Sequence, residues 1–248
     1  MNVGLKRKLR LFGQSIQTTQ DLYPSNGEVY FLWSFIQGSI MIPETRWQLR
    51  HAWGMCERHG FLAVAVEGAF RHCFFHGPAI VYGELMERAL AAFNVIRPFE
   101  EIQIVRHLRE IQPCLMCELE YGPHTHREYL PDYIRAGKDL SQIRAFAQET
   151  APYWRALVCG RCAGTDAQPR CRIHLRQDLA NGSTRIAEKR AQVEYITEHI
   201  ATYRQSFVWE YRDSETLENR AALISAIGWC SGWRPWLVLM NLVPNRTG

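Results

Sequence analysis

Apolar residues recur along this chain at helical spacing, and there is no convincing alternation of apolar and polar residues that would indicate a strand. Proline and glycine divide the first half into segments, because both residues favour helix ends and turns. One very apolar segment ends before Pro43, and the pair Gly77-Pro78 separates two others. Helices are therefore expected over residues 28–42, from 44 towards the Cys56–His59 turn, and over 61–75, 79–96 and 98–112.

The second half contains the clearest single helix. Its apolar residues lie seven, three, four, three and four positions apart: Ile186, Val193, Ile196, Ile200, Tyr203 and Phe207. A repeat this short predicts an ordinary bundle helix and not an intermolecular coiled coil. Other helices are expected over 125–136, which Pro131 kinks or breaks, and over 140–158 and 217–227. Three tryptophans in residues 229–244 predict that this tail packs back on the helices. The expected fold class is all-α, a multi-helix bundle.

Composition divides the chain into three parts. Residues 1–26 hold a run of lysine and arginine followed by a polar stretch, which predicts a basic, loosely ordered arm. Residues 27–112 are expected to form a first helical half. Residues 113–248 are expected to form a second helical half that carries the main Cys/His metal site.

Overall composition is that of a globular protein, with 47% hydrophobic and 22% charged residues. The net charge of +4, from 29 basic and 25 acidic residues, argues only weakly for an anionic partner. No signal peptide is visible at the start. The apolar stretch 29–42 falls short of the roughly twenty residues that span a bilayer, so it predicts a buried helix and no membrane insertion. A reducing cytoplasm with metal-bound thiolates is the expected location.

The cysteines fall into pairs that suit a metal ion. Two ligands three residues apart can face one ion across a tight turn, and tetrahedral zinc needs two such pairs. The chain has four pairs with this spacing outside its most apolar helices: Cys56–His59, Cys114–Cys117, Cys159–Cys162 and Cys171–His174. The sequence therefore predicts one bound Zn²⁺, at most two.

Several groupings of these pairs are open. Cys159 and Cys162 with Cys171 and His174 would close a compact knuckle. A second grouping joins Cys114 and Cys117 to His124 and His126, and a third joins Cys56 and His59 to Cys73 and His76. The third is the weakest, because Cys73 and His76 lie in an apolar helical stretch where a cysteine is usually plain core.

Short motifs also resemble a family of prokaryotic helical proteins whose function is unassigned. In that family each of two similar halves begins with C-x-x-C and returns with a Gly-aromatic-C-x-x-H turn. Here Cys-Leu-Met-Cys at 114–117 and Cys-Arg-Ile-His at 171–174 are similar to such a half, and Trp53-Gly-Met-Cys-Glu-Arg-His59 is similar to the return turn. The resemblance implies two degenerate repeats and one zinc on Cys114, Cys117, Cys171 and His174. The first half lacks its own C-x-x-C, and Cys159–Cys162 is an additional pair that replaces, extends or shares the site.

Common catalytic motifs are missing from the sequence. It has no H-E-x-x-H, no E-x-x-H pair of a di-iron bundle, no P-loop and no G-x-S-x-G. Gln112-Pro113-Cys114 begins the Pro-Cys half of a deaminase signature, but no His-x-Glu lies ahead of it, as that signature requires. The sequence therefore favours a non-enzymatic protein.

The leading hypothesis is a zinc-binding helical protein that serves as a structural or interaction module with a protein partner. The first alternative is a nucleic-acid-binding protein that uses the basic arm and five arginines around the knuckle: Arg155, Arg161, Arg170, Arg172 and Arg176. The second alternative is a redox carrier or an iron–sulfur protein with a cluster on Cys114, Cys117, Cys159 and Cys162.

Overall fold

A computed structural model describes residues 16–71, 75–95, 98–182 and 186–242. Within these ranges the chain is helical throughout its regular structure and has no strand, which confirms the all-α prediction. The first 15 residues, which hold the lysines and arginines of the expected basic arm, lie outside the described residues. The rest of the segment predicted to be a loose arm is ordered instead: it contains a 3-10 turn over Thr19–Leu22 that packs on the helix Arg234–Leu239, and Ile16 and Leu22 are buried.

The first part of the chain forms five α-helices. They are α2 (Asn26–Ile36), α3 (Pro43–His51), α4 (Glu57–Phe70), α5 (His76–Ala91) and α6 (Glu100–His107), with short 3-10 turns η1 (Thr19–Leu22) and η2 (Ser39–Met41). Helix α2 begins where the Ser25 hydroxyl accepts a hydrogen bond from the Glu28 amide and the Glu28 carboxylate accepts one from the Ser25 amide. This capping box fixes the start of the helix more sharply than its apolar pattern does.

Most of the later helices described have nine residues or fewer, and α12 and α13 are longer. They are α7 (Leu115–Glu118), α8 (Pro131–Gly137), α9 (Ser141–Glu149), α10 (Ala151–Trp154), α11 (Arg172–Ala180), α12 (Ile186–Gln205), α13 (Leu217–Cys230) and α14 (Arg234–Leu239), with 3-10 turns η4 (Arg155–Leu157) and η5 (Trp209–Tyr211). Pro131 does not kink a helix; it occupies the first turn of α8, where its missing amide costs nothing. Pro152 similarly opens α10, so the helix expected over 140–158 is divided.

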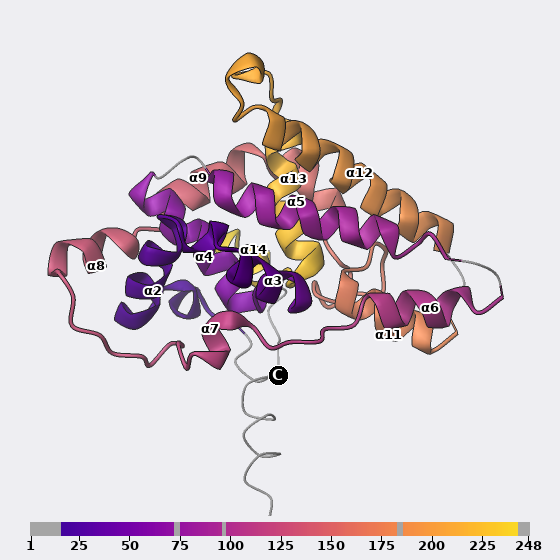
Figure 1. Cartoon of the computed structure of the whole chain (residues 1–248), viewed down its shortest axis with the longest axis horizontal. Coiled ribbons are helices and arrows are strands. Elements are labelled where there is room, and N and C mark those ends of the chain that lie inside the picture. Colours follow the sequence, from indigo (N-terminus) through magenta and orange to yellow (C-terminus); the bar gives the residue numbers. More distant parts are fainter. Residues whose placement is uncertain (1–15, 72–74, 96–97, 183–185, 243–248) are drawn as a thin grey trace, which may run out of the picture.

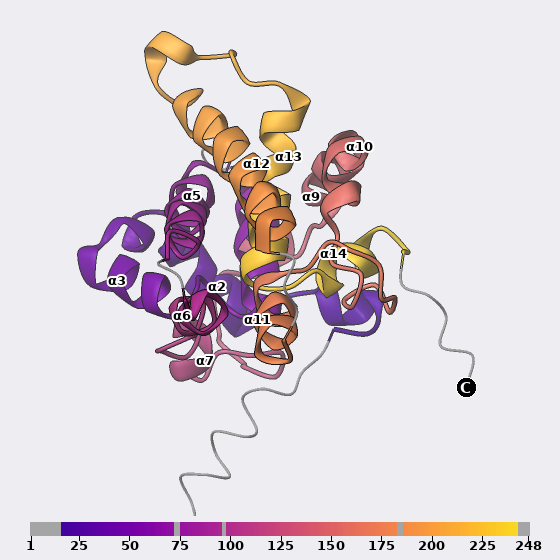
Figure 2. The ribbon, with the colours of Figure 1, turned by 90° about the vertical axis from the view of Figure 1, so that its right-hand side faces the viewer.

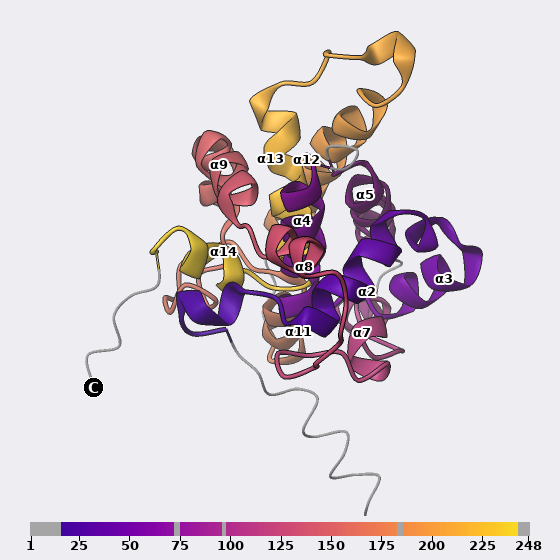
Figure 3. The same ribbon diagram turned by 90° about the vertical axis from the view of Figure 1, so that its left-hand side faces the viewer.

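Helices from both parts of the chain pack on one another. Helix α5 lies beside α12 and α13, α6 beside α11, and α4 beside α8, α9 and α14 (Figures 1 and 2). Seen from the other side, α2 and α8 lie next to each other over α4 (Figure 3). Helices α4 and α13 are almost entirely buried, so they form the centre of the bundle.

The apolar seam of α12 faces this centre as the sequence predicts. Val193, Ile196 and Ile200 are fully buried against α5 and α13. Helix α13 runs three residues beyond its expected end, because Gly228 does not stop the helix. Instead Gly228 lets the Trp233 ring approach: a Cβ atom there would lie 2.5 Å from that ring. The expected return of the tail is confirmed, since Trp229, Trp233 and Trp236 are all buried.

The connection between α12 and α13 projects away from the bundle (Figures 1–3). It carries η5, where Trp209 is 78% exposed and Tyr211 is 54% exposed. None of the helices in the described ranges has an apolar run long enough to cross a membrane.

Candidate metal centres

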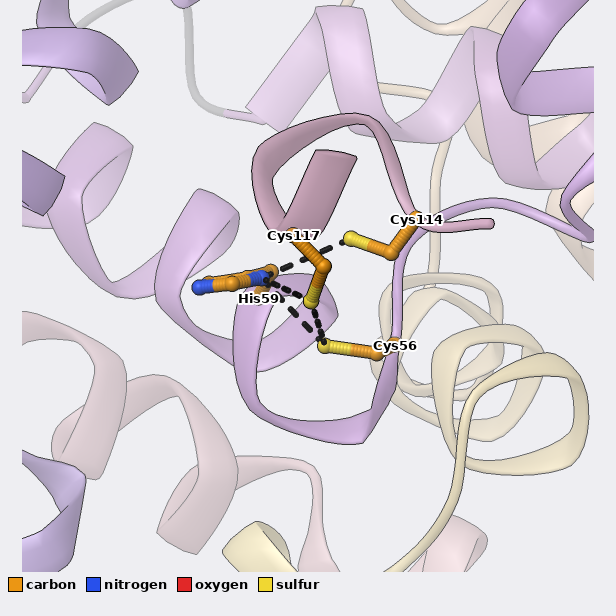
Figure 4. A group of neighbouring side chains, drawn as sticks. All are labelled: Cys56, His59, Cys114 and Cys117. Atoms are coloured by element: carbon orange, nitrogen blue, oxygen red, sulfur yellow. Dashed lines mark hydrogen bonds between the residues drawn. The ribbon is translucent and has the colours of Figure 1, made fainter. Parts of the chain in front are cut away.

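The structure gathers the paired cysteines and histidines into two clusters. Site 1 consists of Cys56, His59, Cys114 and Cys117, and site 2 consists of Cys159, Cys162, Cys171 and His174. Within each cluster all four ligand atoms lie within 4.8 Å of one another. Figure 4 shows the three sulfur atoms of site 1 facing the His59 ring.

Each site contains one Cys-x-x-His pair at the start of a helix. Cys56 is the N-cap of α4 and Cys171 is the N-cap of α11, with nearly the same backbone angles, φ −63° and ψ 169° against φ −77° and ψ 168°. The histidines follow at the third position of the first helical turn. This local geometry brings the sulfur and the imidazole Nδ1 to 3.3 Å in both pairs.

Site 1 is completed by a pair that is distant in sequence. Cys114 caps the single-turn helix α7, and Cys117 lies at its end. The Ile111 amide donates to the carbonyl of His51 at 3.0 Å, which fixes the approach to α7 against the end of α3. The Cys114 and Cys117 sulfurs consequently lie 3.4 Å from His59 Nδ1.

Site 2 is completed by a turn directly before α11. The Gly160 amide donates to the Pro169 carbonyl at 3.1 Å, and the Thr165 amide donates to the Gly160 carbonyl at 2.8 Å. A Cβ atom on Gly160 would lie 1.9 Å from the Ala167 carbonyl oxygen, so only glycine allows the chain to fold back this closely. The turn aims Cys159 and Cys162 at His174, with sulfurs 3.3 and 3.5 Å from Nδ1.

These separations match a tetrahedral zinc ion. Zn–S bonds of about 2.3 Å and Zn–N bonds of about 2.0–2.1 Å place two sulfurs about 3.8 Å apart and sulfur and nitrogen about 3.6 Å apart. The sulfur pairs Cys117–Cys56 and Cys162–Cys171 lie 3.7 and 3.8 Å apart. All the sulfur–Nδ1 separations given above are 3.3–3.5 Å. The described cysteines are free thiols, so these contacts are not disulfides.

A buried carboxylate supports the histidine of site 1. Glu28 is completely buried, and its carboxylate accepts from His59 Nε2 at 3.2 Å and from Arg58 at 2.7 and 2.8 Å. Burial alone would raise the pKa of Glu28, but the hydrogen bonds from Arg58 and His59 lower the pKa to about 2. The ionised carboxylate orients the ring and leaves Nδ1 to bind a metal, as in carboxylate–histidine–zinc arrangements.

Close contact within each cluster favours one thiolate: contacts with Cys114 and Cys117 raise the pKa of Cys56, and contacts with Cys159 and Cys171 raise the pKa of Cys162, while one cysteine in each cluster has a lowered pKa. Although burial raises it, hydrogen bonds from Cys117 and Cys56 hold the pKa of Cys114 well below its ordinary value. Contacts with Cys162 and Cys171 lower the pKa of Cys159 in the same way. Hydrogen bonds to Cys159 and Cys171 raise the pKa of His174 to about 10. Thiolate is the form in which cysteine binds metal, and a metal ion then displaces the remaining protons.

Arg172, the residue after Cys171, contacts several elements that lie between the two sites. This buried guanidinium donates to the carbonyls of Cys230 at 3.0 Å and Leu108 at 2.9 Å, and pairs with Glu110. It also lies 5.3 Å from the ring of Trp53, just before the Cys56–His59 turn. Both sites therefore rest on one scaffold.

The zinc set implied by the family resemblance needs correction. Cys114 and Cys117 do not join Cys171 and His174; they meet Cys56 and His59 instead. The reason is tertiary: α7 is held next to the end of α3 and the start of α4, whereas α11 packs on α6 and α13. The compact grouping of Cys159–Cys162 with Cys171–His174 does form.

The other groupings do not form among the described residues. His124 and His126 are exposed in the segment before α8 and belong to neither cluster. His76 stacks on Phe207 with ring centroids 4.6 Å apart, and Cys73 lies outside the described residues.

The structure removes part of the support for the iron–sulfur and nucleic-acid alternatives. The four cysteines proposed for an iron–sulfur cluster are split two and two between sites 1 and 2. Of the five arginines around the knuckle, Arg161 and Arg170 pair with Asp178, and Arg172 pairs with Glu110. These internal ion pairs take up much of the charge that phosphate groups would need.

Comparison with known protein-family models, with curated proteins and with solved structures finds no match to this chain.

Proposed function

We propose that sites 1 and 2 each bind one Zn²⁺ ion with a structural role, and that the chain is a zinc-stabilised helical interaction protein. The observation that carries this proposal is the geometry of two complete Cys₃His sets with tetrahedral spacing. Four protein ligands close the coordination shell and leave no open position for a substrate, which is typical of structural zinc. A reducing compartment such as the cytoplasm suits the free thiols.

Zinc at these positions would connect two separate elements at each site. At site 1 it joins the start of α4 to the four-residue helix α7, and at site 2 it joins the 159–162 turn to the start of α11. Binding of structural zinc contributes free energy on the order of 10 kcal/mol to folding in small zinc domains. Short helices such as α7 are marginal without such support.

The exposed tip between α12 and α13 supports an interaction role. Trp209 and Tyr211 are largely exposed on this projection, and the Arg212 guanidinium lies 5.2 Å from the Trp209 ring. Tryptophan, tyrosine and arginine are the residues that most often dominate protein interfaces. A protein partner that accepts this tip would bury side chains that otherwise face water.

Elemental analysis of anaerobically purified protein tests the zinc proposal. We expect two Zn²⁺ per chain, one for each cluster, and a colourless protein. Iron with a visible absorption band, or protein that folds fully without metal, would contradict the proposal.

A matched pair of variants tests whether the metal sites support the fold. Cys171→Ser should lower the free energy of unfolding by several kcal/mol, because it removes a zinc ligand. Cys230→Ser, at a buried thiol that contacts Met86 Sδ at 3.9 Å and lies outside both clusters, should cost only about 1 kcal/mol. Chemical denaturation measures both values, and equal losses would be inconsistent with a structural metal at site 2.

A further inference from the structure

Three arginines gather around Trp53, where helix α3 ends. The Arg88 guanidinium lies 4.0 Å from the centre of the Trp53 ring, and the Arg172 guanidinium lies 5.3 Å from it. Arg88 also donates to the backbone carbonyl of Arg50, the next-to-last residue of α3. The three charges come from three helices, α3, α5 and α11, and contact with the indole ring stabilises two of them.

This group carries more positive than negative charge. Glu110 pairs with Arg172, but among the described residues neither Arg50 nor Arg88 has a carboxylate partner. Burial, together with the neighbouring charges of Arg50 and Arg172, lowers the pKa of Arg88 to about 10. Three guanidinium groups against one carboxylate leave a surplus of two positive charges. A zinc ion bound by three thiolates at site 1 would offset one of them, so the group stays positive in either case.

Other carboxylates on the neighbouring elements are already engaged. They are Glu84 with Arg46, Glu87 with Arg204, and Glu118 with Gln48. The last pair lies away from Arg50, because residues two apart on a helix do not face the same side. The surplus charge is therefore confined to the end of α3 and the adjoining side of α5.

Both unpaired guanidinium groups keep donors for a ligand. Arg88 is half-buried and uses one nitrogen on the Arg50 carbonyl, and no other hydrogen bond of its side chain is found in the described ranges. The Arg50 side chain is exposed and makes none there. Backbone oxygens at the end of α3 compete little, because the Leu49 carbonyl accepts from the Gly54 amide at 2.7 Å and the His51 carbonyl accepts from the Ile111 amide at 3.0 Å. Guanidinium donors in this fork arrangement match the oxygens of a phosphate group.

An exposed tryptophan lies one turn before Arg50. Trp47 is 56% exposed, and its ring packs on the His51 ring with centroids 4.1 Å apart. His51 Nδ1 donates to the Trp47 carbonyl at 2.7 Å, which holds the two rings together. Residues three apart on a helix share a face, so Trp47 lies beside Arg50. An exposed aromatic ring next to arginine is typical of surfaces on which nucleotide bases stack.

We infer that Arg50 and Arg88 bind the phosphate of a free nucleoside monophosphate, whose base stacks on Trp47. A phosphate monoester carries between one and two negative charges at pH 7 and so fits the surplus better than a single carboxylate does. One exposed ring and one group of unpaired guanidiniums suit one nucleotide. A nucleic-acid strand needs positive charge that continues along its backbone, whereas the flanking charges on α3 and α5 include the internal pairs Arg46–Glu84 and Arg204–Glu87.

Isothermal titration calorimetry of the full chain tests this inference. The probes are adenosine 5′-monophosphate, adenosine, ribose 5-phosphate and a six-nucleotide strand of adenylate with a 5′-phosphate. Adenosine 5′-monophosphate should bind saturably. Adenosine and ribose 5-phosphate should each bind about tenfold more weakly or worse, because the first lacks the charged hydrogen bonds and the second lacks the stacking base. The strand should bind no more tightly than the mononucleotide.

Variants locate the site. Arg50→Gln should weaken binding of adenosine 5′-monophosphate about tenfold and leave adenosine binding unchanged, because it removes one charged contact with the phosphate. Trp47→Ala should weaken the mononucleotide to a similar extent and leave ribose 5-phosphate unchanged. Arg135→Gln, at an arginine of α8 that is 81% exposed, is the control and should change neither. Circular dichroism and zinc analysis first show that each variant keeps the fold and the metal content of the unaltered protein.

Three results would overturn the inference. The first is the absence of saturable binding of adenosine 5′-monophosphate, or binding of adenosine that is equally tight. The second is unchanged binding in Arg50→Gln, which would mean that the phosphate lies elsewhere. The third is a strand that binds more tightly than the mononucleotide, which would make the ligand a nucleic acid and not a free nucleotide.

Discussion

Sites 1 and 2 have the same donors and the same Cys-x-x-His turn, but they differ in reach along the chain and in contact with water. In site 1 the contacts join residues 55–61 positions apart, whereas in site 2 they span at most 15 positions. His59 is 2% exposed and supported by Glu28, while His174 is half-buried beside an open pocket. The two sites thus offer a metal ion the same donors in different surroundings.

This difference in sequence separation changes the entropic cost of forming each site. Closing a chain segment of about 61 residues costs about 1 kcal/mol more entropy than closing one of about 15 residues. Site 1 therefore depends on the tertiary structure around it and also holds that structure together. Site 2 is a local turn with a smaller entropic cost of closure, and one of its ligands, His174, borders an open pocket.

Metal removal should reveal this contrast most clearly. A strong chelator should extract one Zn²⁺ quickly from site 2 with little change in helix content. The second Zn²⁺ should leave slowly, together with a cooperative loss of helical circular dichroism, because site 1 is buried and its binding energy is on the order of 10 kcal/mol. Dye-detected zinc release, recorded alongside circular dichroism, measures both phases. Release of both ions in one phase, with the helices intact, would remove the distinction between the sites.

Serine variants at two matched cysteines should show the next largest effect. Cys114 and Cys162 are both half-buried and each supplies one sulfur to its site. Cys114→Ser should lower the free energy of unfolding by several kcal/mol, because it releases α7 from α4. Cys162→Ser also removes a zinc ligand and should lower the free energy of unfolding too, but by less than Cys114→Ser does, because the turn that it opens is local. Denaturant titration and zinc analysis of the two proteins check this ranking. A larger loss of unfolding free energy in Cys162→Ser than in Cys114→Ser would contradict it.

Glu28→Gln should affect site 1 alone. It leaves the buried Arg58 without its charged partner, which typically costs about 3–5 kcal/mol. It also weakens the hold on His59, so zinc affinity at site 1 should fall about 10- to 100-fold. Competition with a metal-binding dye measures that affinity. Glu128→Gln, at an exposed position, is the control and should change neither quantity.

Gly160→Ala should produce the smallest effect on the whole protein and a specific one at site 2. The added methyl group would clash with the Ala167 carbonyl oxygen, so the turn that carries Cys159 and Cys162 must open. We expect zinc at site 2 to bind about tenfold more weakly, a loss of about 1.4 kcal/mol, with site 1 and the helix content unchanged. Gly122→Ala, with no atom within 4 Å of its Cβ position, is the control. Unchanged zinc binding in Gly160→Ala would show that the turn adapts.

Much of the fold follows from the sequence pattern, because helical spacing records which side of a helix is buried. The seam of α12 and the tryptophans of α13 and α14 lie where that pattern predicts. The boundaries were harder to predict: Gly228 could be read as a stop, yet it serves ring packing, and Pro131 begins a helix instead of kinking one. Such outcomes depend on neighbours distant in sequence.

The candidate metal ligands could be chosen from spacing, but their grouping could not. A Cys-x-x-His turn is built by local backbone geometry, so both of these pairs were visible in the sequence. The partner of Cys56 and His59 depends on how α3 and α7 dock, which no local pattern records. The sequence did contain one indication of the grouping. Its two Cys-x-x-Cys pairs and two Cys-x-x-His pairs near loops can combine into two Cys₃His sets. The position of Glu28 in the first turn of a helix could also be predicted, since Ser25 and Glu28 form a capping-box motif.

The wide separation of the two halves of site 1 has a consequence for synthesis on the ribosome. At about 5–20 residues per second, Cys114 is added roughly 3–11 s after His59. During that interval the nascent chain offers a zinc ion only two ligands, which hold it weakly and exchange it readily. If site 1 binds zinc as proposed, it would hold the ion firmly only once α7 has been made. The knuckle of site 2 is complete within about 1–3 s of its first cysteine, since Cys159 and His174 are 15 residues apart. Site 1 nevertheless has all four of its ligands first, because Cys117 is added 57 residues, or roughly 3–11 s, before His174.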